Sequence, residues 1–261
     1  MRLRFAKRDK LRFTSHRDVA RAFERAIRRA GIPMAYSSGF TPHPRISWAG
    51  AAPTGAASES EYVELGLAQL RDPDQLARDL DAALPPGIDV LEAVTATPGT
   101  GKLAERIDAS VWELVMYGVD DTQLRPAVDA LFAAGSVPVE RLTKDGRRTI
   151  DVRAALVSAV IEDPLGGGSG DPARVSAGGA TPSCAILRVV VQQTTPVVRP
   201  DDVVAALSAV AGLARFPVPI SSLVTRVAQG RLLEDGSILD PLAADRAAGS
   251  VVSSSVASQE R

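Results

Sequence analysis

The sequence predicts an α+β protein made of two ferredoxin-like halves, each a split β-α-β unit with an antiparallel sheet. Alternating apolar and polar runs, separated by amphipathic stretches with helix start and stop signals, follow the order β-α-β-β-α-β over about the first ninety residues. A similar order recurs after residue 108. With 45% hydrophobic residues, the 261-residue chain can bury the core of one large or two small domains.

The chain begins with two short alternating segments. Residues 2–6 and 11–13 alternate polar and apolar side chains around a turn at 7–10, so we expect two half-buried strand segments.

A helix is predicted to start after Ser15 and to end at Gly31 and Pro33. Ser15 is a favourable N-cap, and Asp18 completes an approximate capping box while favouring the positive end of the helix dipole. Apolar residues at three- and four-residue spacing form the buried stripe: Val19, Phe23, Ala26, Ile27 and Ala30. The outer side carries Arg17, Arg21, Arg25, Arg28 and Arg29.

The rest of the first half supplies three strands and a second helix. The strands are predicted at 45–49, 61–65 and 88–94, with a small-residue connection over 51–60. An acidic, proline-containing first turn opens the helix at 72–84. In this arrangement the helices cover one sheet face and leave the other available, which is a common platform for nucleic acids.

The second half has more insertions than the first. Its predicted elements are strands at 111–119, 137–142, 185–192 and 223–228, helices at 122–134 and 199–210, and a strand and helix segment ending at 160. The resulting domains are 1–95, a linker at 96–108, a second half at 109–241 with a mobile glycine-rich insertion at 163–183, and a disordered tail at 242–261.

Charge is distributed unevenly along the chain. The net charge is −1, but residues 1–50 hold 12 Lys and Arg against 3 Asp and Glu, or +9, and the remainder carries −10. A basic N-terminal region favours a polyanionic ligand, nucleic acid above all, because Arg and Lys make most phosphate contacts. The alternative is an arginine-rich composition that places this residue on any solvated surface.

Composition also excludes several classes of protein. The single cysteine, Cys184, rules out an internal disulfide or a cysteine-held iron–sulfur cluster in this chain. No apolar run is long enough to span a bilayer, so we expect a cytoplasmic protein without a membrane partner. No cofactor and no metal are expected.

Both histidines lie in polar clusters at element boundaries. His16 starts the first helix, where it can act as an acid or base, as a donor to phosphate, or simply as a solvated helix-start residue. His43 lies between two prolines on a stiff loop, which suits either binding or a rigid entry to the next strand. Tyr36 and Phe40 can stack on bases or pack under the loop. With Asp18, the histidines are also candidates for a metal site, although their spacing matches no local metal motif.

The residues around these histidines resemble a known bacterial family. The strings 11–18, 21–31 and 36–47, with later matches at 198–202 and 224–226, are similar to the radical-SAM-linked protein family, a domain of unknown function. The resemblance covers residues 1 to about 235. It implies a partner, a radical SAM protein that is fused to or encoded beside family members, and it implies no reaction.

Three hypotheses follow. In the first, the chain is an accessory binding module that presents RNA or a ribosome-associated substrate to the radical SAM enzyme. Its binding residues would be Ser15, His16, Arg17, Arg21, Arg28, Tyr36, Phe40, His43 and Arg45.

The second hypothesis is an RNA-modifying or RNA-cleaving enzyme, by analogy with the duplicated ferredoxin architecture of pseudouridine synthases and CRISPR-type endonucleases. Its catalytic candidates are His16, Asp18 and His43. The third is a protein scaffold for the radical SAM partner. We expect an accessory protein rather than a stand-alone enzyme.

Overall fold

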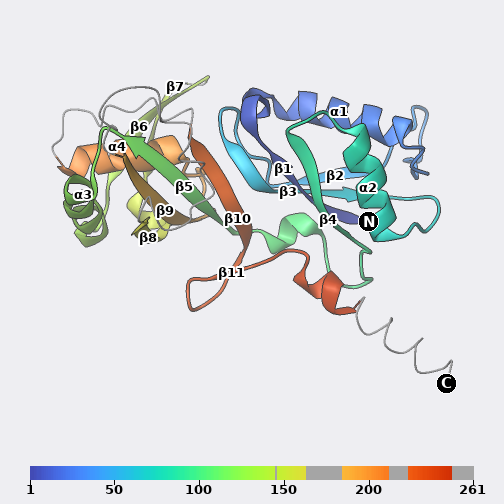
Figure 1. Cartoon of the computed structure of the whole chain (residues 1–261). Helices are drawn as coiled ribbons and strands as arrows, with labels where there is room; N and C mark the ends of the chain where they lie inside the picture. The colour runs from blue at the N-terminus through green and yellow to red at the C-terminus, as the bar shows by residue number, and fades with distance from the viewer. Residues whose placement is uncertain (145, 163–183, 212–222, 249–261) are drawn as a thin grey trace. The chain divides into compact units, whose positions relative to one another are not determined.

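The computed structural model describes residues 1–144, 146–162, 184–211 and 223–248 (Figure 1). The chain divides into two compact units: unit 1 holds residues 1–108 and the chain from 226 onwards, and unit 2 holds residues 109–225. Helices and mostly antiparallel strands build both units, which confirms the predicted α+β class. The exact duplication of a ferredoxin-like unit stays a prediction.

Unit 1 contains the β-α-β-β-α-β order predicted for the first half. Its elements are β1 (Arg2–Lys7), the 3₁₀ helix η1 (Asp9–Phe13), α1 (His16–Arg29), β2 (Ile46–Ala49), β3 (Ala57–Leu65), α2 (Pro73–Ala83), β4 (Ile88–Val94), η2 (Leu103–Arg106), most of β10 (Val224–Leu232) and β11 (Ile238–Leu239). Strand β1 lies between β4 and β3, and β2 pairs with β3, all antiparallel.

Helices α1 and α2 cover one face of this sheet. The buried core between them draws on β1, β3 and both helices: Leu3, Phe5, Val63, Leu65, Val19, Phe23, Ile27, Leu76 and Leu80. At the start of α1 the Ser15 hydroxyl accepts the Asp18 N–H at 3.3 Å, and beyond its end Gly31 has a φ of +62°, which glycine adopts without strain. The predicted helix and its buried stripe are confirmed, except that Ala30 is only half-buried.

The other face of the sheet in unit 1 is covered as well. Tyr62 and Ala49 pack against Leu103 and Ile107 of the η2 segment and against Leu242 near the end of the described chain. Figure 1 shows η2 and this C-terminal turn on the side opposite α1. The expectation of an available sheet face is therefore wrong for most of unit 1, because the segment predicted as a linker brings its own apolar side chains to the sheet.

Unit 2 has a three-stranded sheet in the order β5-β9-β8 and a separate hairpin. Its elements are β5 (Ala109–Tyr117), α3 (Asp121–Ala133), β6 (Pro138–Thr143), β7 (Gly146–Asp151), the 3₁₀ helix η3 (Arg153–Ala155), β8 (Leu156–Glu162), β9 (Cys184–Gln192) and α4 (Pro200–Ala211). Strands β6 and β7 form the hairpin.

Three predicted elements differ in type or length. Residues 11–13 belong to η1 rather than to a strand, because bonds from the Leu11 N–H to Arg8 O and from the Thr14 N–H to Leu11 O close tight turns there. The segment ending at 160 holds η3 and β8 instead of a helix. Strand β3 starts at residue 57 and not 61, since its serines are buried through hydrogen bonds rather than by apolar packing.

Two predicted flexible segments lie wholly or partly outside the described residues. The insertion at 163–183 is entirely outside them. The tail predicted from 242 is described through residue 248, where Leu242 and Asp245 are buried, so that its first turn belongs to unit 1.

Candidate functional site

The outward face of α1 carries a row of exposed arginines with few partners among the described residues. Arg17 and Arg25 are exposed, and within the part of the chain that is described neither side chain has a hydrogen bond or an ion pair. Arg21 makes a long, exposed ion pair at 3.4 Å with Asp18, and Arg28 donates only to the Glu24 carbonyl at 3.3 Å. These side chains can therefore turn toward an external anion without breaking a buried contact.

Asp18, the predicted catalytic aspartate, is occupied by the start of its own helix. Its carboxylate accepts the Ser15 hydroxyl at 2.7 Å, while its N–H donates to the Ser15 oxygen. Together with the Arg21 pair, these contacts give Asp18 a capping role. The contacts of the Asp18 carboxylate are therefore local to the start of α1 and do not point it toward a substrate.

His16 packs on the edge of an aromatic cluster. It is the first residue of α1, it is exposed, and its ring lies 5.2 Å from the Trp48 ring at an interplanar angle of 89°. Trp48 in turn contacts Phe5 and Phe23 edge-on. His16 thus combines an edge-to-face contact with Trp48 with exposure to solvent.

The segment from Tyr36 to Arg45 forms a narrow loop between α1 and β2. The Ser37 N–H donates to the His43 carbonyl at 2.8 Å, the His43 N–H donates to the Ser37 hydroxyl at 3.0 Å, and Tyr36 forms a β-bridge with Pro44. Phe40 is fully exposed, and Tyr36 is 58% exposed. The loop thus presents two aromatic side chains and one histidine to solvent.

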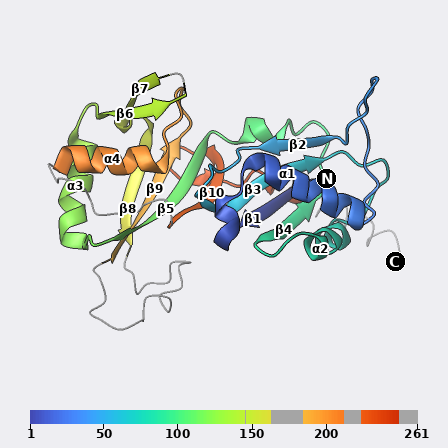
Figure 2. The ribbon, with the colours of Figure 1, turned by 90° about the horizontal axis from the view of Figure 1, so that it is seen from above.

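The structure does not bring His16 and His43 together. Both views place the loop that contains His43 at the C-terminal end of α1, whereas His16 begins that helix (Figures 1 and 2). A helix of 14 residues is about 21 Å long. Among the residues that the structure describes, no group of three His, Cys, Asp or Glu side chains could hold a metal ion. The predicted candidates form two separate regions.

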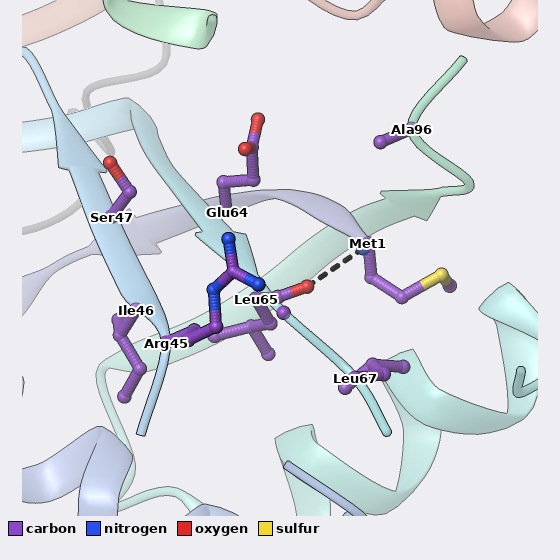
Figure 3. A pocket seen from close by; sticks show the side chains of 9 residues that line it. Met1, Arg45, Ile46, Ser47, Glu64, Leu65, Leu67 and Ala96 are labelled. Atoms are coloured by element: carbon purple, nitrogen blue, oxygen red, sulfur yellow. Dashed lines mark hydrogen bonds between the residues drawn. The ribbon is translucent and has the colours of Figure 1, made fainter. Parts of the chain in front are cut away.

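A pocket of about 490 Å³ lies where β2 and β3 leave the sheet of unit 1 (Figure 3). Figure 3 shows the Arg45 guanidinium inside it, with the side chains of Ser47 and Glu64 on the same side. The lining residues are Met1, Arg45, Ile46, Ser47, Glu64, Leu65, Gly66, Leu67 and Ala96. The lining contains polar and apolar residues, and of the predicted site residues it includes Arg45.

The backbone of Gly66 lies close to the stem of the Arg45 side chain. The Gly66 N–H donates to the Arg45 carbonyl at 2.8 Å, and the Arg45 N–H donates to the Ala35 carbonyl at 2.9 Å. A Cβ on Gly66 would lie 2.8 Å from the Arg45 Cβ, so only glycine permits this close approach. The Arg45 guanidinium has no hydrogen bond or ion pair to any described residue.

Two buried ionic clusters of unit 1 were not predicted from the sequence. In one, Asp245 accepts hydrogen bonds from Arg2 and Arg106. Burial opposes its charged form, but these hydrogen bonds and that of the Thr97 N–H lower the pKa of Asp245 below its ordinary value.

In the other cluster, Glu61 accepts the Arg226 guanidinium and the Ala52 N–H, and Lys7 donates to the carbonyls of Ala52 and Pro53 at 3.5 and 3.3 Å. Burial lowers the pKa of Lys7, and the nearby positive charge of Arg226 adds to the shift. Both clusters join segments that are distant in the chain, which a local pattern does not reveal.

Comparison with known proteins identifies a family and no activity. Residues 1–200 match a family described as "Uncharacterized protein conserved in bacteria", DUF2344. No curated protein matches the chain. None of the helices in the described ranges is both long and apolar enough to cross a membrane.

Proposed function

Since the chain belongs to the bacterial DUF2344 family, we propose on the geometry of its own site that it is an accessory module that binds RNA. In this proposal it presents the RNA, or a ribosome-associated substrate, to a radical SAM enzyme. The single observation that carries the proposal is the row of exposed arginines on α1, of which Arg17 and Arg25 lack an internal partner within the described residues.

The row has the dimensions and charge of a phosphate-binding surface. Arg17, Arg21, Arg25 and Arg28 recur at three- and four-residue spacing, and the rise of a helix spreads them over about 16 Å. Helix α1 holds five arginines against Asp18 and Glu24 alone. A surface of this length can contact several successive phosphates, and each contact releases counterions on binding.

Several other arginines of unit 1 have structural ion pairs instead. Arg2 and Arg8 are paired with carboxylates of the sheet, at 2.7 Å from Glu64 and at 2.8 Å from Asp89. The fold therefore supplies acidic partners where arginines serve structure and supplies few on α1. That contrast supports an external polyanion as the partner of α1.

The capping role of Asp18 favours a binding module over the enzyme hypothesis. A nucleophilic aspartate must face its substrate, whereas the Asp18 carboxylate accepts the Ser15 hydroxyl and the Arg21 guanidinium. The radical SAM partner is supported by the resemblance of residues 11–47 to proteins linked to such enzymes. In the proposal the iron–sulfur cluster belongs to that partner, because this chain has one cysteine.

RNA binding is tested by removing the two unpaired arginines. We expect the full-length Arg17→Gln/Arg25→Gln variant to bind a fluorescent RNA more weakly, with a salt dependence that falls by about 0.7 per lost phosphate contact on a single strand. The matched control is Arg78→Gln/Arg125→Gln, which removes the same charge from exposed positions on α2 and α3. Equal binding by the wild type and the α1 variant, or an equal loss in the control, would contradict the proposal.

The partner is tested by recovery from cells. A tagged full-length chain should co-purify with a radical SAM protein and with a particular RNA after cross-linking. The α1 variant should lose the RNA and keep the protein. Recovery of the protein alone by the wild type would instead support the scaffold hypothesis.

A further inference from the structure

The pocket at Arg45 has features of a site for a small anionic ligand. Its volume of about 490 Å³ falls within the range of small-molecule sites, about 300 to 1,000 Å³. Arg45 and Ser47 supply donors, and Met1, Leu67 and Ala96 add apolar atoms to the lining, whereas the Ile46 and Leu65 side chains point away from Arg45 toward the core (Figure 3). This lining favours a ligand that combines an anionic group with a body that carries both polar and apolar atoms.

Arg45 is the only cationic side chain that lines this pocket. The close approach at Gly66 holds its stem against the backbone, and no described residue neutralises the guanidinium. A guanidinium that is positioned in this way can bind phosphate through two parallel hydrogen bonds. The pocket thus offers one positive charge without a counter-ion among the described residues.

The other polar side chains suit hydroxyl groups. One oxygen of Glu64 accepts the Arg2 Nε at 2.7 Å, and its second carboxylate oxygen has no hydrogen-bond partner in the described chain. Figure 3 shows the side chains of Glu64 and Ser47 on the same side of the strands as that of Arg45. A free carboxylate oxygen and a serine hydroxyl are suitable partners for ribose hydroxyls or for the donors on a base edge.

The loop before Arg45 adds aromatic side chains. Tyr36 and Phe40 are exposed, and the backbone pairing of Ala35 with Arg45 connects the loop directly to the pocket. Exposed aromatic rings stack on bases only where those bases are unpaired. A duplex offers phosphates to α1 but no free base face to this loop.

We propose that the Arg45 pocket binds one nucleoside phosphate, with the phosphate on Arg45 and the ribose or base edge against Ser47 and Glu64. This inference rests on the proposed function, because the nucleoside phosphate in the pocket would be an unpaired nucleotide of the bound RNA. A free mononucleotide has the same chemistry and is the alternative source of the ligand.

The test compares three ligands on full-length protein: a single-stranded oligoribonucleotide, the duplex of the same sequence, and adenosine 5′-monophosphate. We expect the single strand to bind more tightly than the duplex.

The variants assign this difference to Arg45. Arg45→Gln should weaken single-strand binding by at least about tenfold and change duplex binding little, whereas the α1 double variant should weaken both. Gly66→Ala, which displaces Arg45 without removing its charge, should reproduce the Arg45→Gln pattern. Arg78→Gln is the control, and circular dichroism checks that each variant folds.

Each outcome separates the two proposals. Equal binding of single strand and duplex, with Arg45→Gln affecting neither or both alike, would overturn the nucleotide pocket and leave RNA binding by α1 intact. Binding of the mononucleotide alone, lost in Arg45→Gln, would support the pocket and overturn the RNA function. Absence of binding to all three ligands would overturn both.

Discussion

The Arg2 guanidinium donates from one nitrogen to both carboxylate oxygens of Asp245, at 2.8 and 2.9 Å. The Asp245 side chain is fully buried, and Arg106 adds a third hydrogen bond at 2.7 Å. Because these residues lie at opposite ends of the chain, the contact ties the C-terminal turn to the first strand of unit 1. Asp245 thus pairs with two guanidinium groups, of which Arg2 has Glu64 as a second carboxylate partner.

We expect Asp245→Ala to destabilise the protein strongly. The change removes the carboxylate partner of Arg106 and one of the two carboxylate partners of Arg2, and breaking a buried ion pair costs about 3 to 5 kcal/mol. Urea unfolding followed by circular dichroism measures the loss. Asp79→Ala is the control, because Asp79 pairs with Arg71 at 3.1 Å near the surface, where such pairs contribute about 0 to 1 kcal/mol. Similar losses of unfolding free energy in both variants would show that the buried cluster stabilises the protein no more than a surface ion pair does.

The same carboxylate predicts acid sensitivity. Burial opposes the charged form of Asp245, but hydrogen bonds from Arg2 and its neighbours lower the pKa below the ordinary value of 3.8. A lowered pKa contributes stability above the ordinary value, and this contribution is lost as pH falls through the folded-state pKa. The gap in unfolding free energy between wild type and Asp245→Asn should therefore be widest near neutral pH and should narrow on acidification below the ordinary pKa. A gap that is constant with pH would contradict this assignment.

Local patterns predicted the first half of the fold well. Helix α1 could be recognised because its cap at Ser15, its apolar spacing and its stop at Gly31 all lie within a short stretch. Strand β3 was predicted too short, since Ser58 and Ser60 have no apolar signal and are buried through contacts with β10, about 170 residues away. The Arg2 to Asp245 contact was not predictable for the same reason.

The site was predicted only in part. The exposed arginines of α1 follow from helical periodicity, and the structure places them as expected. Whether His16 and His43 meet in space could not be predicted from their proximity in the sequence, because α1 lies between them. Ser47, Glu64 and Gly66 were missed, since the pocket arises only when β2 pairs with β3.

Gly230 should not tolerate a side chain. A Cβ there would lie 2.0 Å from the Leu239 carbonyl oxygen, and backbone atoms of β11 cannot move aside as a flexible side chain can. We expect Gly230→Ala to lower the unfolding free energy by about 1 to 3 kcal/mol or more, as overpacking does. The control, Gly135→Ala, meets no atom within 4 Å and should change stability by less than about 0.5 kcal/mol. Urea unfolding of both variants distinguishes a close backbone approach from a general effect of glycine replacement.

The buried charge of Lys7 should lower the unfolding free energy of the protein at neutral pH. Its side chain is nearly fully buried, and among the described residues it donates only to two carbonyls, at 3.3 and 3.5 Å. Burial lowers the pKa of Lys7 from its ordinary value of 10.5. Between the two pKa values the unfolded state binds more protons than the folded state, so this residue makes stability rise with pH. A neutral side chain of similar length would avoid the cost of the buried charge.

We therefore expect Lys7→Met to be at least as stable as wild type near pH 7, because Glu61 keeps Arg226 as its partner. Any advantage of the variant should shrink as pH rises from the lowered folded-state pKa of Lys7 toward the ordinary value of 10.5, above which Lys7 is uncharged in both states. Urea unfolding at several pH values measures both effects, with Lys10→Met as the control at an exposed lysine of η1. A loss of more than about 1 kcal/mol at neutral pH would show instead that the charged form of Lys7 is needed by Glu61 or by the loop that covers it.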